Sequence, residues 1–316
     1  MYKFAFTYLV RQDKKSWNDF STSLYLLNKN ILSKIDCKFK ILIFCEGEPS
    51  KKAMGLINAL LKKSIKIVLR KISLQNYVKR KSSEKYKKYF PHVSDCTKTF
   101  SIGYRDMCKF FAFDIFKDKE LKDSEYFIRV DTDSFFLDVR KKFIYNLQNI
   151  KADYGYIYTT IQLEDKSVSL GFGNCLYNFC KQKEIKNYLP KDYLHICQEA
   201  TSNPKLFYTN FEVINLKWIK NNLLTELLKY IIKEKGIYNF RWGDSLIRYY
   251  SIKLIGAEAV PLRGCLYKHQ SIFDSRNFIK RIFSKIYFKI NSKLHRDQFE
   301  IKTTKLDRFF LDIKKL

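Results

Sequence analysis

The segment EYFIRVDTDSFF, residues 125–136, decides the fold class expected for this chain. It is an apolar and aromatic run that leads into two carboxylates, Asp131 and Asp133, which stand two residues apart. A short run rich in aromatic and β-branched residues predicts a buried strand. In α/β sheets, ligands bind beyond the carboxyl ends of the strands. We therefore expect Asp131 and Asp133 to lie at the ligand-binding edge of a sheet.

The residues before this segment alternate between strand and helix patterns. YKFAFTYLV at 2–10, FKILIFCEG at 39–47 and IKIVLRKI at 65–72 are rich in β-branched and aromatic residues and predict strands. Segments with helical apolar spacing near 16–33 and 50–63 predict helices between them. This order predicts an α/β fold with a mixed, largely parallel central sheet flanked by helices.

A Lys-, Ser- and Tyr-rich stretch at 74–103 interrupts the alternation and predicts a long active-site loop or excursion. The remaining elements are then expected in this order: a helix at 104–116, the strand at 125–136, a strand at 153–162, a helical region at 176–200, a strand entering a helix at 207–219, a helix at 222–235 that Gly236 can cap, a loop that becomes a helix at 236–255 and a short strand at 257–264.

Composition allows a large core but does not identify a partner. The chain has 316 residues, of which 46% are hydrophobic, enough for one large α/β domain or two smaller ones. Its 60 Lys and Arg residues against 32 Asp and Glu residues give a formal charge of +28, which favours a polyanionic partner such as nucleic acid or an anionic membrane. A coding bias toward AT-rich codons would produce the same abundance of Lys, Ile, Phe, Tyr and Asn.

The eight cysteines, at 37, 45, 96, 108, 175, 180, 197 and 265, include no CxxC pair and no zinc-finger spacing. We interpret them as reduced core thiols, which favours a cytosolic setting, although pairing of Cys175 with Cys180 or Cys197 stays open. The first residues, MYKFAFTYLVRQ, have no signal-peptide pattern, and no stretch of about 18 uncharged apolar residues predicts a transmembrane helix. Any membrane contact is therefore expected to be peripheral.

The tail after residue 272 has a different pattern, so we divide the chain into a domain at 1–272 and a tail at 273–316. SRNFIKRIFSKIYFKINSKL, from residue 275, places apolar and basic residues on opposite sides of a helix. Such a basic amphipathic helix either binds an anionic membrane surface or packs on the domain with its basic side in solvent.

Two acidic features are candidates for chemistry. Asp131 and Asp133 are suited to hold a divalent cation that neutralises a diphosphate, although an isolated Asp-x-Asp also occurs at solvated strand ends. Glu212, in YTNFEVINL, is a lone carboxylate among apolar residues. It is either an exposed residue of an alternating strand, or a group that stabilises an oxocarbenium-like transition state or attacks as a nucleophile.

Two further features follow. RWGD at 241–244 combines Arg241, Trp242 and Asp244 within four residues. Trp242 is expected to stack on a sugar ring, and Asp244 either accepts a hydrogen bond from a sugar hydroxyl or caps the helix that starts there. His269, in LYKHQ, is either a surface histidine or a metal ligand beside oxygen donors.

Together and in order, these motifs resemble a known family. YRDMCKFFA, YFIRVDTDSFF, DYGY, FYTNFEVINL, GIYNFRWGDSLIRYY and LYKHQ are similar to glycosyltransferase family fifteen, the fungal-type glycolipid and glycoprotein α-1,2-mannosyltransferases. The resemblance covers residues from about 104 to 270, and TYLVR at 7–11 is similar to the family's first nucleotide-binding strand. It implies that 1–272 is a GT-A type domain whose substrates are a GDP-mannose donor and a glycan or glycolipid acceptor, with Mn²⁺ as cofactor.

The resemblance also implies roles for individual residues. Asp133 matches the aspartate of the family's Glu-Pro-Asp metal motif, Asp131 stands where the family has Glu, and His269 matches its second metal ligand. Glu212 matches the glutamate of the Asn-Phe-Glu motif, proposed as nucleophile or transition-state stabiliser. The catalytic pair implied is Glu212 and Asp244; the donor- and acceptor-binding positions implied are Arg11, Tyr104, Arg129, Arg241 and Trp242.

The chain departs from the family in two respects. Thr132 replaces the family's Pro but leaves both carboxylates in place. The family's amino-terminal membrane anchor is not seen, so we expect a cytoplasmic enzyme, peripheral on the cytoplasmic face of a membrane. Neither 74–103 nor the tail after 272 resembles the family.

The function expected is a retaining hexosyltransferase that moves mannose from GDP-mannose to a hydroxyl of a glycan or glycolipid, with α-1,2 linkage and Mn²⁺ dependence. Double displacement through Glu212 and front-face attack both retain configuration and stay open. The alternative is a basic nucleic-acid-binding protein or metal-dependent nuclease, favoured by the charge of +28. No nucleic-acid-binding module is visible, and a nuclease leaves the order of the motifs unexplained, so a nucleic acid partner is not expected.

Overall fold

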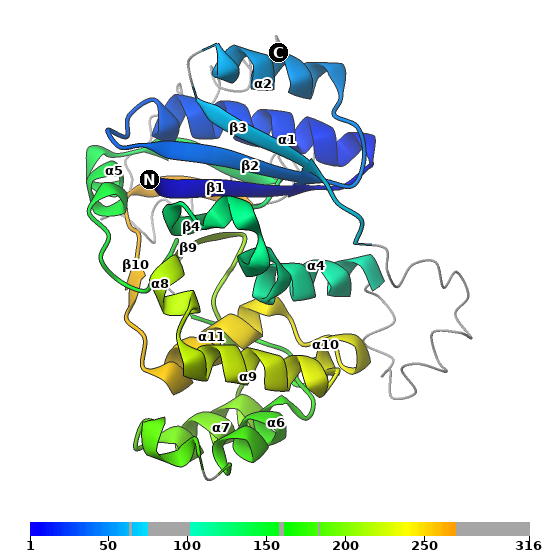
Figure 1. The fold of residues 1–316 in the computed structure, drawn as a ribbon, viewed down its shortest axis with the longest axis vertical. Coiled ribbons are helices and arrows are strands. Elements are labelled where there is room, and N and C mark those ends of the chain that lie inside the picture. The colour runs from blue at the N-terminus through cyan, green and yellow to red at the C-terminus, as the bar shows by residue number, and fades with distance from the viewer. Residues whose placement is uncertain (63–64, 75–101, 158–160, 183, 270–316) are drawn as a thin grey trace, which may run out of the picture.

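The computed structural model describes residues 1–62, 65–74, 102–157, 161–182 and 184–269 (Figure 1). Most of the predicted excursion at 74–103 and the whole predicted tail at 273–316 lie outside the described residues. Within the described part of the chain, no helix has both the length and the apolar character needed to cross a membrane.

A mixed sheet of seven strands forms the centre of the described structure, as predicted. The spatial order is β10 (Ala259–Pro261), β6 (Tyr154–Tyr156), β9 (Phe211–Asn215), β4 (Ser124–Val130), β1 (Tyr2–Val10), β2 (Phe39–Cys45) and β3 (Lys66–Lys71). β1 pairs in parallel with β2 and β4, β2 with β3, and β6 with β10, whereas β9 runs antiparallel to both of its neighbours, β4 and β6. Two small ribbons stand apart from this sheet: β5 (Ser134–Val139) with β11 (Cys265–His269), and β7 (Gln162–Leu163) with β8 (Lys205–Leu206).

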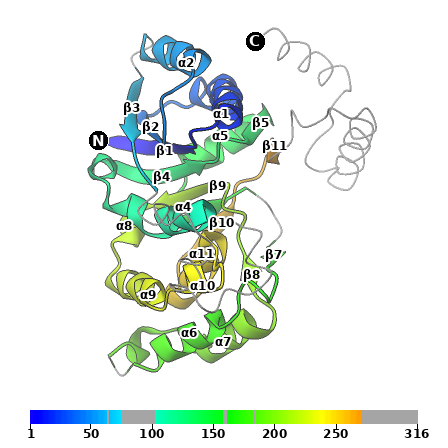
Figure 2. The ribbon, with the colours of Figure 1, turned by 90° about the vertical axis from the view of Figure 1, so that its right-hand side faces the viewer.

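Helices cover both faces of the sheet (Figure 2). One face carries α1 (Lys14–Leu27), α2 (Lys51–Leu61) and α5 (Lys141–Gln148). The other carries α4 (Ile102–Ala112), α8 (Leu216–Ile219), α9 (Asn222–Lys233), α10 (Gly236–Asn239) and α11 (Asp244–Ile255), with α6 (Phe172–Cys180) and α7 (Tyr193–Ser202) farthest from the sheet.

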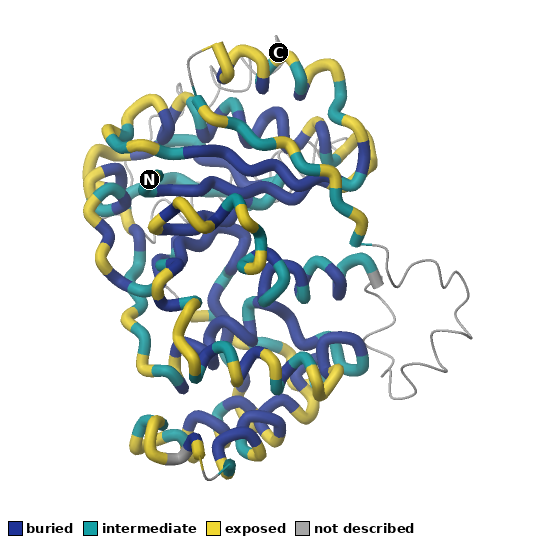
Figure 3. The backbone as a smooth tube through the Cα atoms, viewed as in Figure 1, coloured by how far each residue is buried: buried dark blue, intermediate teal, exposed yellow. Residues whose placement is uncertain are grey.

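The central strands are buried on both faces, as Figure 3 shows for most of their length. In β1, Phe4 and Phe6 pack into the core under α1 and α2, while Ala5 and Leu9 pack into the core under α4 and α11. Strands covered by helices on both sides are apolar along their whole length, which explains the continuous apolar run of YKFAFTYLV. The central strands, including their carboxyl ends, are therefore fixed between two hydrophobic cores, one on each face of the sheet.

The predicted strand at 125–136 is divided in two by its acidic residues. β4 ends at Val130 and β5 begins at Ser134, and the amide of Ser134 donates to the carbonyl of Asp131 at 3.0 Å to close the turn between them. β5 then pairs with β11 instead of the central sheet. The prediction of one continuous strand was therefore wrong, because the polar Asp-Thr-Asp turn interrupts it and leads the chain out of the central sheet into β5.

Three other predicted elements are interrupted. The helix expected at 16–33 ends as α1 at Leu27 and continues as a π-helical turn, Asn28–Leu32, in which Asn30 donates to the carbonyl of Phe136 at 2.6 Å. The helical region at 176–200 is two helices, α6 and α7. The strand at 153–162 is shortened to β6, with Gln162 in β7. In the first case a tertiary contact, from Asn30 to β5, accompanies the change of helix type.

Gly236 was predicted to cap α9, and this was wrong. Lys235 takes the left-handed conformation, with φ of 58°, and Gly236 begins α10. A Cβ atom at Gly236 would lie 2.2 Å from ring atoms of Trp242, so this position needs glycine for close packing. The indole of Trp242 thereby reaches the core between α10 and α6.

We predict that Gly236→Ala lowers the free energy of unfolding by about 1–3 kcal/mol, because the new methyl group overpacks against a buried indole. Gly55→Ala is the matched control, because Gly55 lies on the exposed side of α2 and, among the residues that the structure describes, no other atom lies within 4 Å of a Cβ atom built there. The control should raise stability by about 0.5–1 kcal/mol. Urea unfolding of both variants checks this, and equal effects would contradict it.

Candidate functional site

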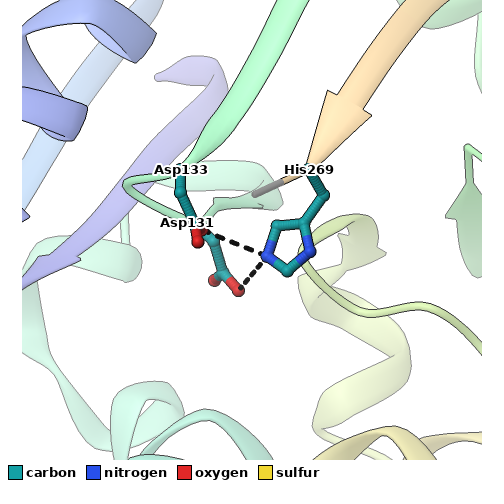
Figure 4. A group of neighbouring side chains, drawn as sticks. All are labelled: Asp131, Asp133 and His269. Carbon is teal, nitrogen blue, oxygen red and sulfur yellow. Dashed lines mark ion pairs between the residues drawn. The ribbon is translucent and has the colours of Figure 1, made fainter. Parts of the chain in front are cut away.

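Asp131, Asp133 and His269 form a group of possible metal ligands (Figure 4). Nε2 of His269 lies 3.1 Å from Oδ1 of Asp133 and 4.0 Å from Oδ2 of Asp131. One ligand atom from each residue lies within 4.8 Å of the others. His269 ends β11 and is the cross-strand partner of Ser134, which follows Asp133, so the ribbon explains the meeting of distant segments. The predicted metal-ligand set is therefore brought together.

The two carboxylates have different electrostatic surroundings. Burial raises the pKa of Asp131 and outweighs the opposing effect of Arg129. Burial also acts to raise the pKa of Asp133, but the hydrogen bond and charge of His269 outweigh it and leave that pKa lowered. Asp133 is thus held ionised beside the imidazole, as a metal ligand needs to be.

The ring of His269 is oriented from its other side. Nδ1 lies 3.3 Å from the hydroxyl of Tyr208, and the two rings meet edge to face with centroids 5.5 Å apart. A hydrogen bond at one ring nitrogen selects the tautomer and leaves the other nitrogen for a metal. Since Nε2 faces the carboxylates, Tyr208 supports Nε2 as the ligand atom.

Arg129 joins the metal-ligand group to the rest of the site. Its Nε donates to Oδ1 of Asp131 at 2.7 Å, and its Nη1 donates to Oδ2 of Asp244 and to Thr209. The guanidinium lies 3.8 Å from the ring centroid of Phe111. Although burial opposes charge on this group, Asp131 and Asp244 raise its pKa further above the ordinary value. Arg129 is therefore a permanent buried cation between two carboxylates.

Asp244 does not cap α11, which corrects that alternative. Gly243 is the N-cap residue and no side chain caps the helix, whereas Asp244 is the first helical residue. Its carboxylate accepts from Thr209 Oγ1 at 2.7 Å and from Arg129. Burial acts to raise the pKa of Asp244, but Arg129 and Thr209 outweigh it and lower the pKa.

Glu212 is fully buried, so the interpretation as an exposed strand residue was wrong. It lies on β9 as the register partner of Arg129, and its Oε2 accepts from Nε of Arg248 at 3.2 Å. Burial raises the pKa of Glu212 despite the nearby Arg248 and Arg129. The Tyr154 hydroxyl adds a polar neighbour that lowers this pKa. The catalytic role of Glu212 stays a prediction. In this structure its side chain is shielded from solvent and paired with Arg248.

Trp242 is only 2% exposed, so its ring offers no face to a sugar in this structure, contrary to the stacking expected. The ring packs against Phe172, with centroids 5.1 Å apart, and Nε1 donates to the carbonyl of Leu170. Arg241 has a left-handed backbone, with φ of 65°, and its Nη2 lies 3.6 Å from Oε1 of Glu164. The RWGD segment therefore brings Arg241 and Asp244 to the site and uses Trp242 as an anchor.

Tyr104 and Arg11 occupy different positions. Tyr104, on α4, lies 5.9 Å from the guanidinium of Arg241, and the thiol of Cys108, burial and Asp244 all raise its pKa. Tyr104 is thus half-buried beside Arg241, with Asp244 near enough to affect its pKa. Arg11 directly follows β1 at the same sheet edge as Asp131, and its side chain is 74% exposed with Asp13 at 3.7 Å. Its guanidinium is accessible to an anionic ligand.

Several residues that hold this site were not predicted from the sequence. Tyr208, Thr209 and Asn210 precede β9, and their polar run ahead of an apolar strand was the signal that could have identified them. Tyr267, two residues before His269, was hidden in an ordinary strand pattern, and Arg248 in a helix. The partners of Tyr267 and Arg248 are remote in the sequence, so no local pattern indicates these two residues.

We predict that Arg129→Ala lowers the free energy of unfolding by about 3–5 kcal/mol, because the carboxylates of Asp131 and Asp244 would stay buried without their cation. Lys229→Ala is the control, since it removes an exposed pair with Glu226 and should change stability by less than about 1 kcal/mol. Urea unfolding at neutral pH measures both. A decrease in the free energy of unfolding below about 1 kcal/mol for Arg129→Ala would show that the ion pairs of Arg129 with Asp131 and Asp244 do not organise the site.

The chain is similar to a known protein family and to several of its members. A family model described as glycolipid 2-alpha-mannosyltransferase matches residues 6–274. Probable mannosyltransferase KTR3 of Saccharomyces cerevisiae is 30% identical over 149 residues, covering 46% of this chain and 36% of that protein. Probable mannosyltransferase KTR2 of the same yeast is 23% identical over 171 residues, covering 49% and 40%. These matches span less than half the length of either relative.

Two solved structures share the fold. Core-mannan synthase A (CmsA/Ktr4) from Aspergillus fumigatus, in a Mn/GDP form, has a TM-score of 0.67 and 16% identity, and the match covers 85% of this chain and 75% of that one. The mannosyltransferase Ktr4p from S. cerevisiae in complex with GDP has a TM-score of 0.65 and 17% identity, covering 85% and 71%. The predicted GT-A type α/β fold is confirmed. Because the family model matches residues 6–274, which is most of the chain, the chain belongs to the glycolipid 2-alpha-mannosyltransferase family, glycosyltransferase family fifteen.

Proposed function

We propose that this chain is a Mn²⁺-dependent mannosyltransferase that moves mannose from GDP-mannose to a hydroxyl of a glycan or glycolipid, with retention and an α-1,2 linkage. The observation that carries the proposal is the convergence of Asp131, Asp133 and His269 at the carboxyl edge of the sheet in a member of this family. The solved relatives in Mn/GDP and GDP forms support the donor class.

The residues present fit a divalent cation. Asp131 and Asp133 offer carboxylate oxygens and His269 offers Nε2, a mixed oxygen and nitrogen set that suits Mn²⁺. When ionised, the carboxylates of Asp131, Asp133, Glu212 and Asp244 carry four negative charges. The guanidinium groups of Arg129 and Arg248 carry two positive charges, so the net charge is about −2, which a divalent cation balances. When bound, such an ion neutralises the negative charge that develops on a leaving diphosphate.

Other residues of the chain prepare the site for this reaction. Arg129 fixes the Asp131 carboxylate, and Tyr208 fixes the ring of His269. Both orient ligand atoms before substrate arrives, which lowers the cost of reorganisation during reaction. Arg11, exposed beyond the end of β1, is placed to bind the anionic part of the donor. Arg241 and Asp244 both come from the RWGD segment, and we expect the sugar hydroxyl groups to lie on the side of the site that this segment forms.

The surroundings of Glu212 bear on how configuration is retained. A nucleophilic carboxylate needs a path to C1 of mannose, and Glu212 is 0% exposed and paired with Arg248. Double displacement would require this buried pair to open, at the free-energy cost of separating buried charges. Front-face attack has no such requirement, since an oxygen of the leaving diphosphate accepts the proton of the acceptor hydroxyl. We therefore favour front-face attack, with Glu212 remaining in its buried pair with Arg248.

GDP-mannose hydrolysis by the purified protein tests the donor, the metal and the site. We expect GDP release with Mn²⁺, loss of release with EDTA, and a decrease of at least about 100-fold for Asp133→Ala, because charge stabilisation at the leaving group is removed. UDP-linked sugars and other GDP-linked sugars run beside it to identify the donor.

Asp138→Ala is the matched control, because Asp138 lies on the same ribbon and its Oδ1 accepts from the amide of Val139 instead of joining the metal-ligand group. We expect it to retain activity near the wild-type level. Absence of turnover and of binding with every sugar nucleotide would contradict the transferase proposal. Salt-sensitive DNA binding in that protein would favour the nucleic-acid alternative.

We also propose that the basic tail makes peripheral contact with an anionic membrane on its cytoplasmic face, beside lipid-linked acceptors. The proposal rests on the amphipathic pattern of residues 275–294 in the sequence. A protein ending at residue 274 should keep GDP-mannose hydrolysis but no longer float with liposomes that contain phosphatidylserine. Equal flotation of the full chain and the shortened chain would contradict the proposal and favour a tail that packs on the domain.

A further inference from the structure

A buried hydrogen-bond network lies directly behind the metal-ligand group. The backbone carbonyl of Asn210 accepts from the amide of Asp131 at 2.9 Å and from Oγ of Ser134 at 3.0 Å. Asp131 and Ser134 are the two ends of the acidic turn that contains Asp133. One carbonyl at the start of β9 therefore fixes both ends of the turn.

The same network reaches the strand that carries His269. The hydroxyl of Tyr267 lies 2.6 Å from Oγ of Ser134 and 3.0 Å from Oδ1 of Asn210. Residues two apart on a strand point to the same face, so Tyr267 and His269 approach the acidic turn together. The side chains of Ser134, Asn210 and Tyr267 thus connect β5, β9 and β11.

Burial makes these bonds strong constraints. Ser134 is 0% exposed and Asn210 is 5% exposed, whereas Tyr267 is half-buried. The ring of Tyr267 packs against Phe136 and Phe211, with centroids 5.2 Å and 6.5 Å apart, so its hydroxyl has little freedom. In a low-dielectric interior a satisfied polar network rigidifies the elements that it joins.

We propose that Ser134, Tyr267 and the Asn210 side chain form a positioning network that sets the separation of the Asp133 and His269 ligand atoms, and with it the affinity for a divalent cation. The metal part of this inference rests on the proposed function. β5 and β11 belong to a separate ribbon, so the central sheet alone does not hold His269 against Asp133. The ribbon itself pairs His269 with Ser134, and the network ties this ribbon to β9 of the central sheet.

Manganese binding, measured without substrate or turnover, tests the inference. Free Mn²⁺ is followed by its electron paramagnetic resonance signal during titration of the full chain and of Tyr267→Phe, Ser134→Ala and the double variant. Tyr267→Phe keeps the packed ring and removes one hydroxyl. Each single variant should weaken Mn²⁺ binding by about 10- to 100-fold, as loss of groups that orient metal ligands does elsewhere. The double variant should lose less than the product of the two, because both act through one network.

Tyr126→Phe is the matched control, since the hydroxyl of Tyr126 is also buried and donates to the carbonyl of Ile150 at 2.9 Å, at the opposite end of β4 from Asp131. It should lower the urea midpoint about as much as Tyr267→Phe and leave Mn²⁺ affinity unchanged. A wild-type chain that binds Mn²⁺, with Tyr267→Phe and Ser134→Ala within about twofold of it, would overturn this inference alone. A wild-type chain that binds no Mn²⁺ would overturn the metal site of the proposed function as well.

Discussion

The guanidinium of Arg129 lies between the carboxylates of Asp131 and Asp244, and the arrangement of the site depends on this buried contact. The two carboxylates come from the end of a central strand and the start of a helix, 115 residues from Arg129 in the case of Asp244. A buried charge costs several kcal/mol unless it is paired, so the cation and both anions stabilise one another's burial. The same contact orients Asp131 toward His269 and ties α11 to the sheet.

The antiparallel strand β9 gives the site its second side. Because β9 runs against β4, its amino end lies at the sheet edge where β4 ends. Thr209 and Asn210, which precede β9, therefore stand beside Asp131: Thr209 donates to Asp244, and Asn210 accepts from the Asp131 amide. A purely parallel sheet would place these residues at the other edge. One reversed strand thus supplies the polar residues that hold the metal-ligand group in place.

Burial separates the predicted site residues into three kinds. Glu212 and Trp242 are enclosed, the first beside Arg248 and the second by Phe172 and α10, so neither side chain offers a free surface to a ligand. Arg11 stands in solvent beyond β1. Asp133 and His269 lie between these extremes, partly buried and partly exposed, which is suited to a cation that must also contact a diphosphate.

The sequence by itself determined the layers of the fold and two of the three members of the metal-ligand group. The continuous apolar runs of β1 and β2 and the alternation with helices predict a sheet covered on both faces, and the spacing of Asp131 and Asp133 is a local property. Only the tertiary structure decided that His269 meets Asp133, that Asp244 pairs with Arg129 instead of capping its helix, and that Gly236 makes room for Trp242. The reason is physical: periodicity and capping patterns act over a few residues, whereas these contacts join segments more than a hundred residues apart, or depend on which side chain fills a shared space in the core.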